Sequence, residues 1–358
     1  MKLLDKYILK KFLTAFFFVV LLLEAVICII DVTERLDDYI NSGASFMTVF
    51  TGYYLNFIPY IANMLSPITV FIATVYVTAK LASHTEIIAI LASGVSFKRF
   101  LVPYIIGASL IAIATFYLIG WVIPKANKGR IDFESQYLES QYFFDGRNVH
   151  LKIAPNTYVY LESYNSNMNM GYQFTLEHIK NNKLQYKLKT DKIAWEEKNK
   201  AWHLDNYSER EFKNGKEYYR KGVNKKIRIN LLPKDFGNTY MLQSTFTLPE
   251  LIKYIKELED KGAENVNVYQ VEKYERYTYP FAIIILTIIG VVVSAKKSRE
   301  GTGFKIAFGF VLAFIYILMV IVSRNFANVG DIHPFMAAWI PNILFSVIGF
   351  LMYRSVPK

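Results

Sequence analysis

Hydrophobic residues concentrate in two blocks, one at each end of the 358-residue chain, and a polar stretch over residues 124–276 separates them. A helix needs about 20 apolar residues to cross a bilayer. Each block holds three runs of about that length, so we expect six transmembrane helices, at residues 12–30, 55–79, 101–123, 277–295, 304–322 and 335–353. Prolines inside some runs are compatible with this because neighbouring helices can satisfy the carbonyl groups that a proline leaves free.

The polar stretch shows the shorter period of β-strands. Alternation or strand-forming composition predicts strands within residues 148–164, 174–179, 184–193, 201–212 and 225–232. Residues 180–183 and 197–200 have the composition of hairpin turns, and Trp195 and Trp202 are placed to pair across the second turn. Single strands with water on both faces are unstable, which favours a curled sheet or a sandwich.

The polar stretch ends with a predicted helix. Thr247 to Glu250 form a capping box with a proline in the first turn. One apolar face follows at helical spacing, made of Leu248, Leu251, Ile252, Ile255 and Leu258.

Basic residues are distributed as in a membrane protein of defined orientation. The net charge is +11, and with the N-terminus inside, the cytoplasmic ends would hold Lys2, Lys6, Lys10, Lys11, Lys80, Lys98, Arg99, Lys296, Lys297, Arg299, Lys305, Arg354 and Lys358. The two short outer loops would hold Arg35 and Arg324 with five acids, Asp31, Glu34, Asp37, Asp38 and Asp331. Positive charge favours the cytoplasmic side, so both termini are predicted inside and the β-rich insert outside. This distribution disfavours nucleic acid as the reason for the basic charge.

Signatures of catalysis and metal binding are missing from the sequence. It lacks a G-x-x-x-x-G-K-[ST] phosphate loop and a G-x-S-x-G motif, and its five histidines lack metal-ligand spacing. The single cysteine, Cys28, excludes an intramolecular disulfide. The first apolar run is longer than a typical signal-peptide core and lacks a cleavage site, which indicates a retained helix. We therefore expect no catalysis, metal or cofactor on this chain.

The segment between the second and third runs is the most informative. Ser83 and Glu86 have capping-box spacing, Leu81, Ile88, Leu91 and Val95 share one helical face, and Gly94 can end a helix. The pattern predicts a short amphipathic helix over residues 81–95 at the cytoplasmic surface. Such a helix either connects two spans or docks a cytoplasmic partner, and its residues alone leave both open.

The spacing Ser83-x-x-Glu86-Ile87-x-x-x-x-Ala92-Ser93-Gly94-Val95-Ser96 resembles the corresponding loop of permease subunits in lipopolysaccharide export, the LptF/LptG family. The opening Leu4-Asp5-Lys6-Tyr7-Ile8, the helix at residues 248–255 and Tyr269-x-x-Glu272-x-x-x-Arg276-x-x-x-Pro280 also resemble that family. The likeness covers nearly the whole chain.

This resemblance implies a domain order. Residues 1–123 would carry three spans with a coupling helix at about 81–95, residues 124–246 a periplasmic β-jellyroll, residues 247–276 a helical connector, and residues 277–358 three more spans. The chain would be a multi-pass protein of the bacterial inner membrane.

The resemblance also implies partners. A second LptF/LptG-type permease would pair with this chain, and a cytoplasmic ABC ATPase dimer would use ATP and magnesium. Lipopolysaccharide would pass to periplasmic jellyroll proteins of the LptC and LptA type. The ATPase-docking residues would be Ser83, His84, Glu86, Ile87, Ile90, Leu91 and Gly94.

Spans one and five would be lateral gates of a cargo cavity. The candidate cavity residues are Glu24, Asp31, Arg35, Phe308, Phe314 and Tyr316. Glu24 either faces this cavity or bonds a neighbouring helix, since an ionisable group inside a span avoids lipid. Arg35 is a lone base among acids, which departs from the basic outer end of span one in the family. A divalent cation bridging these acids to sugar phosphates is one hypothesis.

Two other functions are compatible with parts of the pattern. A membrane-anchored scaffold would use the β-rich insert to recruit a partner, without transport. An ion-coupled carrier needs several ionisable groups near the bilayer midplane, and this chain offers Glu24 almost alone. The sequence does not distinguish an F-type from a G-type permease.

Overall fold

The computed structural model describes residues 3–138, 149–154, 156–165, 168–181, 183–197, 199–213, 215–233, 242–261, 266–295 and 301–354. They divide into two compact units. The helical unit comprises Met1–Glu139, Ser244–Leu248 and Asn267–Lys358. The strand-rich unit comprises Ser140–Gln243 and Pro249–Val266. Each unit is described by itself.

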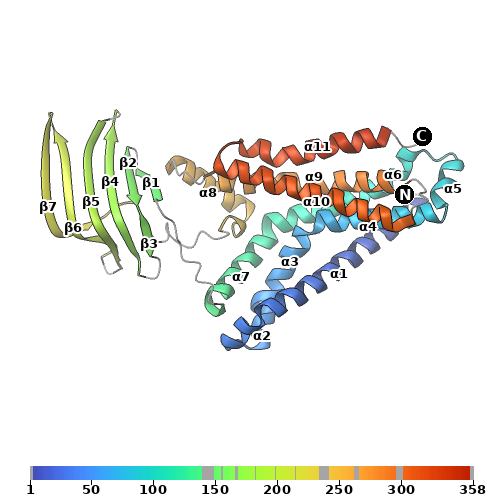
Figure 1. The fold of residues 1–358 in the computed structure, drawn as a ribbon, viewed down its shortest axis with the longest axis horizontal. Coiled ribbons are helices and arrows are strands. Elements are labelled where there is room, and N and C mark those ends of the chain that lie inside the picture. Colours follow the sequence, from blue (N-terminus) through green and yellow to red (C-terminus); the bar gives the residue numbers. More distant parts are fainter. Residues whose placement is uncertain are drawn as a thin grey trace. The chain divides into compact units, whose positions relative to one another are not determined.

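The helical unit is a bundle of long apolar helices (Figure 1). Within the part of the chain that the structure describes, six helices are long and apolar enough to cross a membrane, which confirms the predicted number of spans. The elements are α1 (Leu3–Asn41), α2 (Phe46–Val49), η1 (Phe50–Tyr54), α3 (Leu55–Met64), α4 (Ser66–Ser83), α5 (Glu86–Ala92), α6 (Phe97–Tyr117), η2 (Leu118–Val122), α7 (Ile123–Tyr137), α9 (Val266–Ser294), α10 (Gly301–Val329) and α11 (Pro334–Arg354). Residues 31–41, predicted as loop, instead continue α1 as helix.

The second predicted span is broken between α3 and α4 at Leu65. Pro67 has no N–H, so the carbonyl of Asn63 loses its helical partner. The hydroxyl of Tyr279, on α9, lies 2.9 Å from that carbonyl oxygen and 2.9 Å from the carbonyl oxygen of Met64. A neighbouring helix therefore satisfies the break, as expected for a proline inside a membrane bundle.

Two apolar clusters hold the bundle together. One joins α1, α4, α6 and α9, with Phe12, Leu81 and Tyr104 almost fully buried. The other joins α4, α9, α10 and α11 around Phe71 and Phe345. Large aromatic side chains bury much apolar area, so they contribute strongly to the packing of both clusters.

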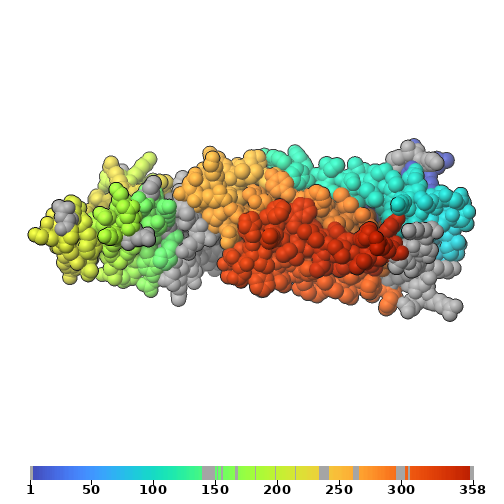
Figure 2. All heavy atoms as spheres, turned by 90° about the horizontal axis from the view of Figure 1, so that it is seen from above, coloured from blue at the N-terminus to red at the C-terminus, as the bar shows by residue number. Residues whose placement is uncertain are grey.

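The outward faces of α1, α10 and α11 are apolar. Figure 2 shows α11, in red, lying lengthwise over one face of the helical unit. Its exposed side chains include Phe335, Met336, Ile343, Leu344, Val347, Phe350 and Leu351. A water-soluble protein rarely exposes so continuous an apolar surface, so this face is suited to lipid.

Among its described residues, the strand-rich unit contains one antiparallel sheet of seven strands, β1 (Val149–Ala154), β2 (Thr157–Leu161), β3 (Ser163–Asn165), β4 (Met170–Lys180), β5 (Lys183–Glu196), β6 (Ala201–Lys213) and β7 (Lys216–Ile227). The order is β1-β2-β4-β5-β6-β7, with β3 beside β4. One face is packed around Phe174, Leu204 and Trp202, whose indole N–H donates to the Leu231 carbonyl (2.7 Å). The predicted inserted β-domain is therefore confirmed as a sheet among the described residues.

The predicted turns and tryptophan pair are present. Lys180 pairs with Lys183, and Trp195 pairs with Trp202 at 5.2 Å between ring centroids. The last strand was predicted wrongly at residues 225–232, since β7 begins at Lys216. Most residues of β7 are polar, so the strand lacks a clear alternation of apolar and polar positions. The hairpin signal Asn214-Gly215 that precedes it was overlooked.

The helix α8 (Leu248–Lys261) follows the sheet in the sequence, as predicted. Four of the five predicted apolar positions, Leu248, Leu251, Ile255 and Leu258, are buried. The fifth, Ile252, is 46% exposed and lies off that face.

Candidate functional site

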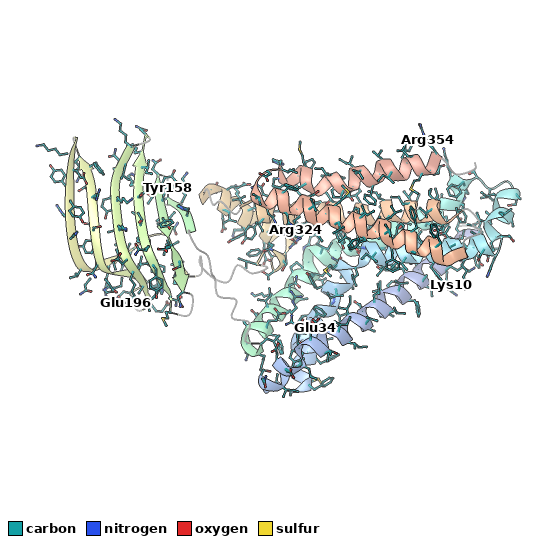
Figure 3. The ribbon with its side chains drawn as sticks, in the orientation of Figure 1. Lys10, Glu34, Tyr158, Glu196, Arg324 and Arg354 are labelled. Atoms are coloured by element: carbon teal, nitrogen blue, oxygen red, sulfur yellow. The ribbon has the colours of Figure 1, made fainter. Side chains whose placement is uncertain are left out.

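The short helix α5 lies at the same end of the bundle as the start of α1 and the end of α11 (Figure 1). Lys10 and Arg354 lie at this end, whereas Glu34 and Arg324 lie in the other half of the helical unit (Figure 3). Of the predicted cytoplasmic charges, Lys2, Lys296, Lys297, Arg299 and Lys358 lie outside the described residues.

The turn into α5 differs from the predicted capping box. α4 continues to Ser83, whose hydroxyl donates to the Lys80 carbonyl (2.9 Å) and caps nothing in α5. Thr85 precedes α5 with φ +60°, a left-handed conformation that is uncommon for a β-branched residue. The helix therefore begins at Glu86 and is shorter than the predicted 81–95. Gly94, at φ +84°, follows its end as expected.

This later start changes which side chains face inward. Ile87 is 2% exposed and packs in the cluster that contains Leu81, so it supports α5 from inside and leaves no surface for a partner. Ile90 and Leu91 are half-buried against the same cluster. Ile88, predicted to share a helical face with Leu81, is 56% exposed, whereas Leu81 is fully buried. The exposed surface of α5 and its flanks consists of Ser83, His84, Thr85, Ile88, Ala89, Ala92, Ser93 and Gly94.

Glu86 connects α5 to the first helix. The Tyr7 hydroxyl donates to Glu86 Oε2 (2.9 Å), and Lys11 Nζ lies 3.6 Å from Oε1. Lys11 also donates to the Tyr7 hydroxyl, and His84 Nδ1 lies 3.8 Å from Glu86 Oε1. Glu86 therefore fastens α5 to α1 rather than capping its own helix, and we call these four residues the α1–α5 junction.

A second ion pair fastens α1 at the same end. Arg99, in the first turn of α6, donates from Nη2 to Asp5 Oδ2 at 2.6 Å. Asp5 is 4% exposed, and a buried carboxylate requires such a partner. The start of α1 is thus tied to both helices that flank the turn after α5.

In the other half of α1, Asp31 is a structural acceptor. The hydroxyl groups of Tyr53 and Tyr54 donate to Asp31 Oδ1 and Oδ2 at 3.0 and 2.9 Å. Arg35 Nε lies 3.3 Å from Oδ1. Both Asp31 oxygens therefore already interact with side chains of this chain.

Arg35 carries this network to α7. Its Nη1 lies 3.5 Å from Glu134 Oε1, and the Arg130 guanidinium lies next to the same carboxylate at 3.9 Å. Arg130 and Glu134 are 5% and 7% exposed, and Arg130 stacks over the Tyr60 ring at 4.7 Å. The charges predicted for cargo thus join α1, η1 and α7 into one ionic and aromatic cluster.

A family scan links these features to known proteins. The model for the lipopolysaccharide export system permease LptF/LptG matches residues 6–355. The chain belongs to the LptF/LptG family. This membership implies a role in lipopolysaccharide export and places the chain among the membrane permeases of that system. No curated protein matched the chain.

The candidate cavity residues of this LptF/LptG permease fall into three groups. Phe308 and Phe314 are 41% and 60% exposed on α10. Tyr316 is 3% exposed and donates to Asn342 Oδ1 of α11 (2.9 Å), so its assignment to an open cavity was wrong. Glu24 is partly buried, and its Oε1 has no hydrogen-bond partner among the described residues.

A charged cluster between α9 and α10 was missed. Glu272 accepts from Arg276 Nε (3.0 Å) and Arg324 Nη2 (3.0 Å), and Arg324 Nη1 lies 3.1 Å from Glu275. Arg276 also donates to the Phe246 carbonyl (2.7 Å). The signal was present in the motif from Tyr269 to Pro280, where Glu272 and Arg276 have the i, i+4 spacing of a helical ion pair. In this permease the cluster anchors the chain segment that precedes α8 to α9.

No group of three or more His, Cys, Asp or Glu side chains within the described part of the chain is arranged to hold a metal ion. The sites found above are helix junctions and exposed surfaces.

Proposed function

We propose that this chain is the permease subunit of an ABC-type exporter. It extracts lipopolysaccharide from the outer leaflet of the inner membrane and passes it to a periplasmic bridge of LptC- and LptA-type proteins. The family membership, the six candidate membrane helices and the inserted sheet support this proposal. The distribution of basic residues along the chain supports cytoplasmic termini and a periplasmic β-domain. In this proposal that domain is jellyroll-like, as in the LptF/LptG family.

The observation that carries the proposal is the surface of α5. Ile88 is 56% exposed, the small residues Ala89 and Ala92 of the same helix are exposed as well, and α5 lies at the end of the bundle that holds the start of α1. Small side chains around one apolar anchor let a partner approach the helix backbone closely, as in helix-in-groove recognition. The partner in this proposal is the ABC ATPase dimer. ATP and magnesium are assigned to this partner because the sequence of the permease has no phosphate loop.

The α1–α5 junction supplies a route from the ATPase to the membrane. Ile87 fixes α5 to the core, and Glu86 bonds Tyr7 of α1. When the ATPase closes on ATP and displaces α5, these contacts move the start of α1 with it. Glu86 then acts as the link between the docking helix and the first span, in addition to any contact with the ATPase.

The exposed apolar faces of α1 and α10 support the lateral gates. Phe17, Phe18 and Leu21 on α1 are 59%, 65% and 65% exposed, and α10 exposes Phe308 and Phe314. In the proposed assembly a second LptF/LptG-type permease faces these helices. The two then enclose a cavity whose apolar walls accept the acyl chains of lipopolysaccharide.

The experiment is co-purification of the full chain from gently solubilised membranes, with mass spectrometry of the bound proteins. Ile88→Glu places a charge on the proposed docking surface, and Val223→Glu on β7, where Val223 is 67% exposed, is the matched control. We expect an ATPase with a phosphate loop and a second permease with the wild type and the control. We expect loss of the ATPase with Ile88→Glu.

If the Ile88→Glu variant still retained the ATPase, the proposal that the ATPase docks on α5 would be wrong. Absence of any ATPase from the wild-type preparation, with a periplasmic partner still bound, would favour a membrane-anchored scaffold.

A further inference from the structure

The sheet has a pocket on the face opposite its apolar core. The pocket has a volume of about 470 Å³ and is lined by residues of β1, β2, β4 and β5 together with Glu162, which follows β2. Sites for small molecules have volumes of roughly 300–1,000 Å³. The core face of the same strands carries Leu161, Leu176 and Leu188, and nine of the ten lining residues are polar or titratable, so the pocket lies on the polar face.

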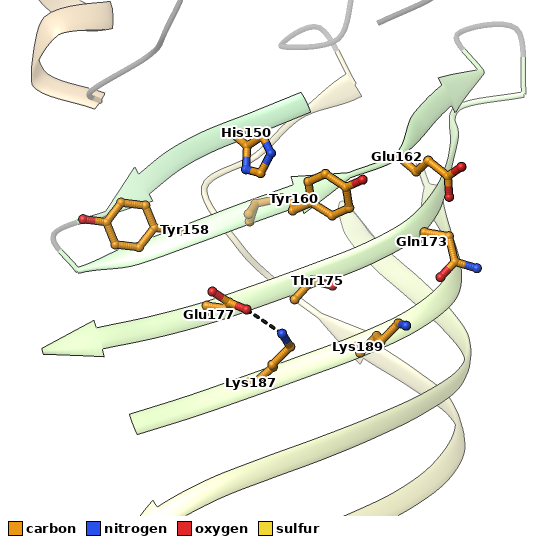
Figure 4. Close-up of a pocket in the computed structure, with 10 residues that line it drawn as sticks. His150, Tyr158, Tyr160, Glu162, Gln173, Thr175, Glu177, Lys187 and Lys189 are labelled. Atoms are coloured by element: carbon orange, nitrogen blue, oxygen red, sulfur yellow. Dashed lines mark ion pairs between the residues drawn. The ribbon is translucent and has the colours of Figure 1, made fainter. Parts of the chain in front are cut away.

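Strand register arranges the pocket in rows (Figure 4). In one row His150 pairs with Tyr160, Tyr160 with Thr175, and Thr175 with Lys189. The His150 and Tyr160 rings lie 4.7 Å apart between centroids. This row places two ring systems at one end and an ammonium group at the other.

The next row runs parallel to the first. Tyr158 pairs with Glu177, and Glu177 pairs with Lys187, whose Nζ lies 2.7 Å from Glu177 Oε1. Tyr158 is 40% exposed, so a ligand can reach its ring. Lys187 is neutralised by its partner, whereas Lys189 of the first row has no ion-pair partner among the described residues.

A bend in the sheet forms the end of the pocket. Glu162 interrupts the strand between β2 and β3, and Gln173 has φ +51°. Left-handed backbone at a residue other than glycine is unfavourable and concentrates at functional sites. The Gln173 amide donates weakly to Asp191 Oδ1 (3.4 Å), so its carbonyl oxygen is available.

We propose that this pocket binds a saccharide. Tyr158 and Tyr160 offer ring faces to the C–H face of a sugar, Lys189 and the tyrosine hydroxyl groups donate, and Glu162 and Gln173 accept. Sugar hydroxyl groups both donate and accept, so they match a lining that mixes the two. The two lysines and two glutamates of the lining balance in charge, which favours a polar ligand over a strongly charged one. The inference rests on the pocket and not on the proposed transport.

The test is saturation-transfer NMR on the purified full chain with two probes. One is the oligosaccharide released from lipopolysaccharide by mild acid, and the other is maltotriose. We expect saturable binding of at least one probe, and Tyr158→Ala and Lys189→Ala should each weaken it by about fivefold or more. Tyr172→Ala is the control, because Tyr172 is also 40% exposed on this sheet and does not line the pocket.

Binding of the released oligosaccharide alone would identify the ligand as the sugar part of the export cargo. Equal binding of both probes would identify a general saccharide site. Absence of saturable binding by either probe, or equal affinity in wild type and Tyr158→Ala, would overturn the proposal. None of these outcomes depends on whether the ATPase docks on α5.

Discussion

The Tyr7 hydroxyl donates a 2.9 Å hydrogen bond to Glu86, although the two residues are 79 positions apart. This bond joins the first helix of the bundle to the seven-residue helix α5. A displacement of α5 therefore cannot leave the start of α1 unaffected while the bond persists. In an export permease, such a bond can transmit a movement of α5 to the first membrane helix.

Tyr7→Phe removes this bond and keeps the ring. The junction is partly exposed, so the expected cost is about 0.5–1 kcal/mol. We expect faster hydrogen exchange in residues 84–93 and slower ATP-driven export, with the ATPase still bound. Tyr76→Phe on α4, where Tyr76 is 45% exposed, is the control. Unchanged exchange and export in Tyr7→Phe would show that the Tyr7–Glu86 hydrogen bond does not couple α1 to α5.

Asp31→Ala leaves the hydroxyl groups of Tyr53 and Tyr54 without their acceptor. The unfolding midpoint of the full chain in detergent should fall, because loss of an acceptor for partly buried donors costs about 1–3 kcal/mol. Asp38→Ala, at an exposed position on the same helix, should leave the midpoint nearly unchanged. A purely cargo-binding Asp31 would instead reduce lipopolysaccharide crosslinking without any loss of stability.

Tyr279→Phe leaves the Asn63 carbonyl unsatisfied at the break between α3 and α4. A net cost of about 1 kcal/mol is expected, visible as a lower unfolding midpoint and faster exchange around Leu65. Tyr277→Phe is the matched control, since Tyr277 is on the same helix and is 40% exposed. Equal behaviour of the two variants would mean that water or lipid satisfies the carbonyl instead.

Glu209 should make the stability of the sheet depend on pH. Burial opposes its ionisation, but hydrogen bonds from Lys225 and Tyr186 lower the pKa of its carboxyl below the usual value. A carboxyl whose pKa is lower in the folded state stabilises that state above its unfolded pKa of about 4.3 and loses this effect as pH falls through the folded pKa.

The measurement is the thermal midpoint of the sheet, followed by tryptophan fluorescence in a Trp121→Phe, Trp339→Phe background. Between about pH 5 and pH 3, the fall in midpoint should be smaller in Glu209→Gln than in this parent protein. Glu217→Gln, an exposed change on β7, should keep the parental fall. An identical fall in all three proteins would exclude Glu209 as a source of the acid sensitivity.

The hydrophobic pattern predicted the number of spans because bilayer thickness sets a length that few other structures require. It did not predict the contacts at their ends. Leu81 and Ile88 share a face if one helix covers residues 81–95, and the left-handed turn at Thr85 places them in different environments. A turn of this kind in a β-branched residue has no sequence signal.

For the candidate sites, too, the sequence identified residues but not their contacts. Arg35 and Asp31 were recognised as unusual, yet their partners Glu134, Tyr53 and Tyr54 come from distant or unassigned segments. Tyr316 lies in an apolar run, and its bond to Asn342 of α11 could not be read from either residue alone. The polar pocket of the sheet depends on strand register, which alternation alone leaves undefined.

The most direct test of the central claim is ATP-driven export in proteoliposomes. The purified complex of this chain, its partner permease and the ATPase would be reconstituted with lipopolysaccharide, and transfer to a soluble periplasmic acceptor would be followed by photocrosslinking. We predict ATP-dependent transfer by the wild type and by Val223→Glu, and its loss in Ile88→Glu. Transfer that is independent of ATP, or that persists in Ile88→Glu, would contradict the account.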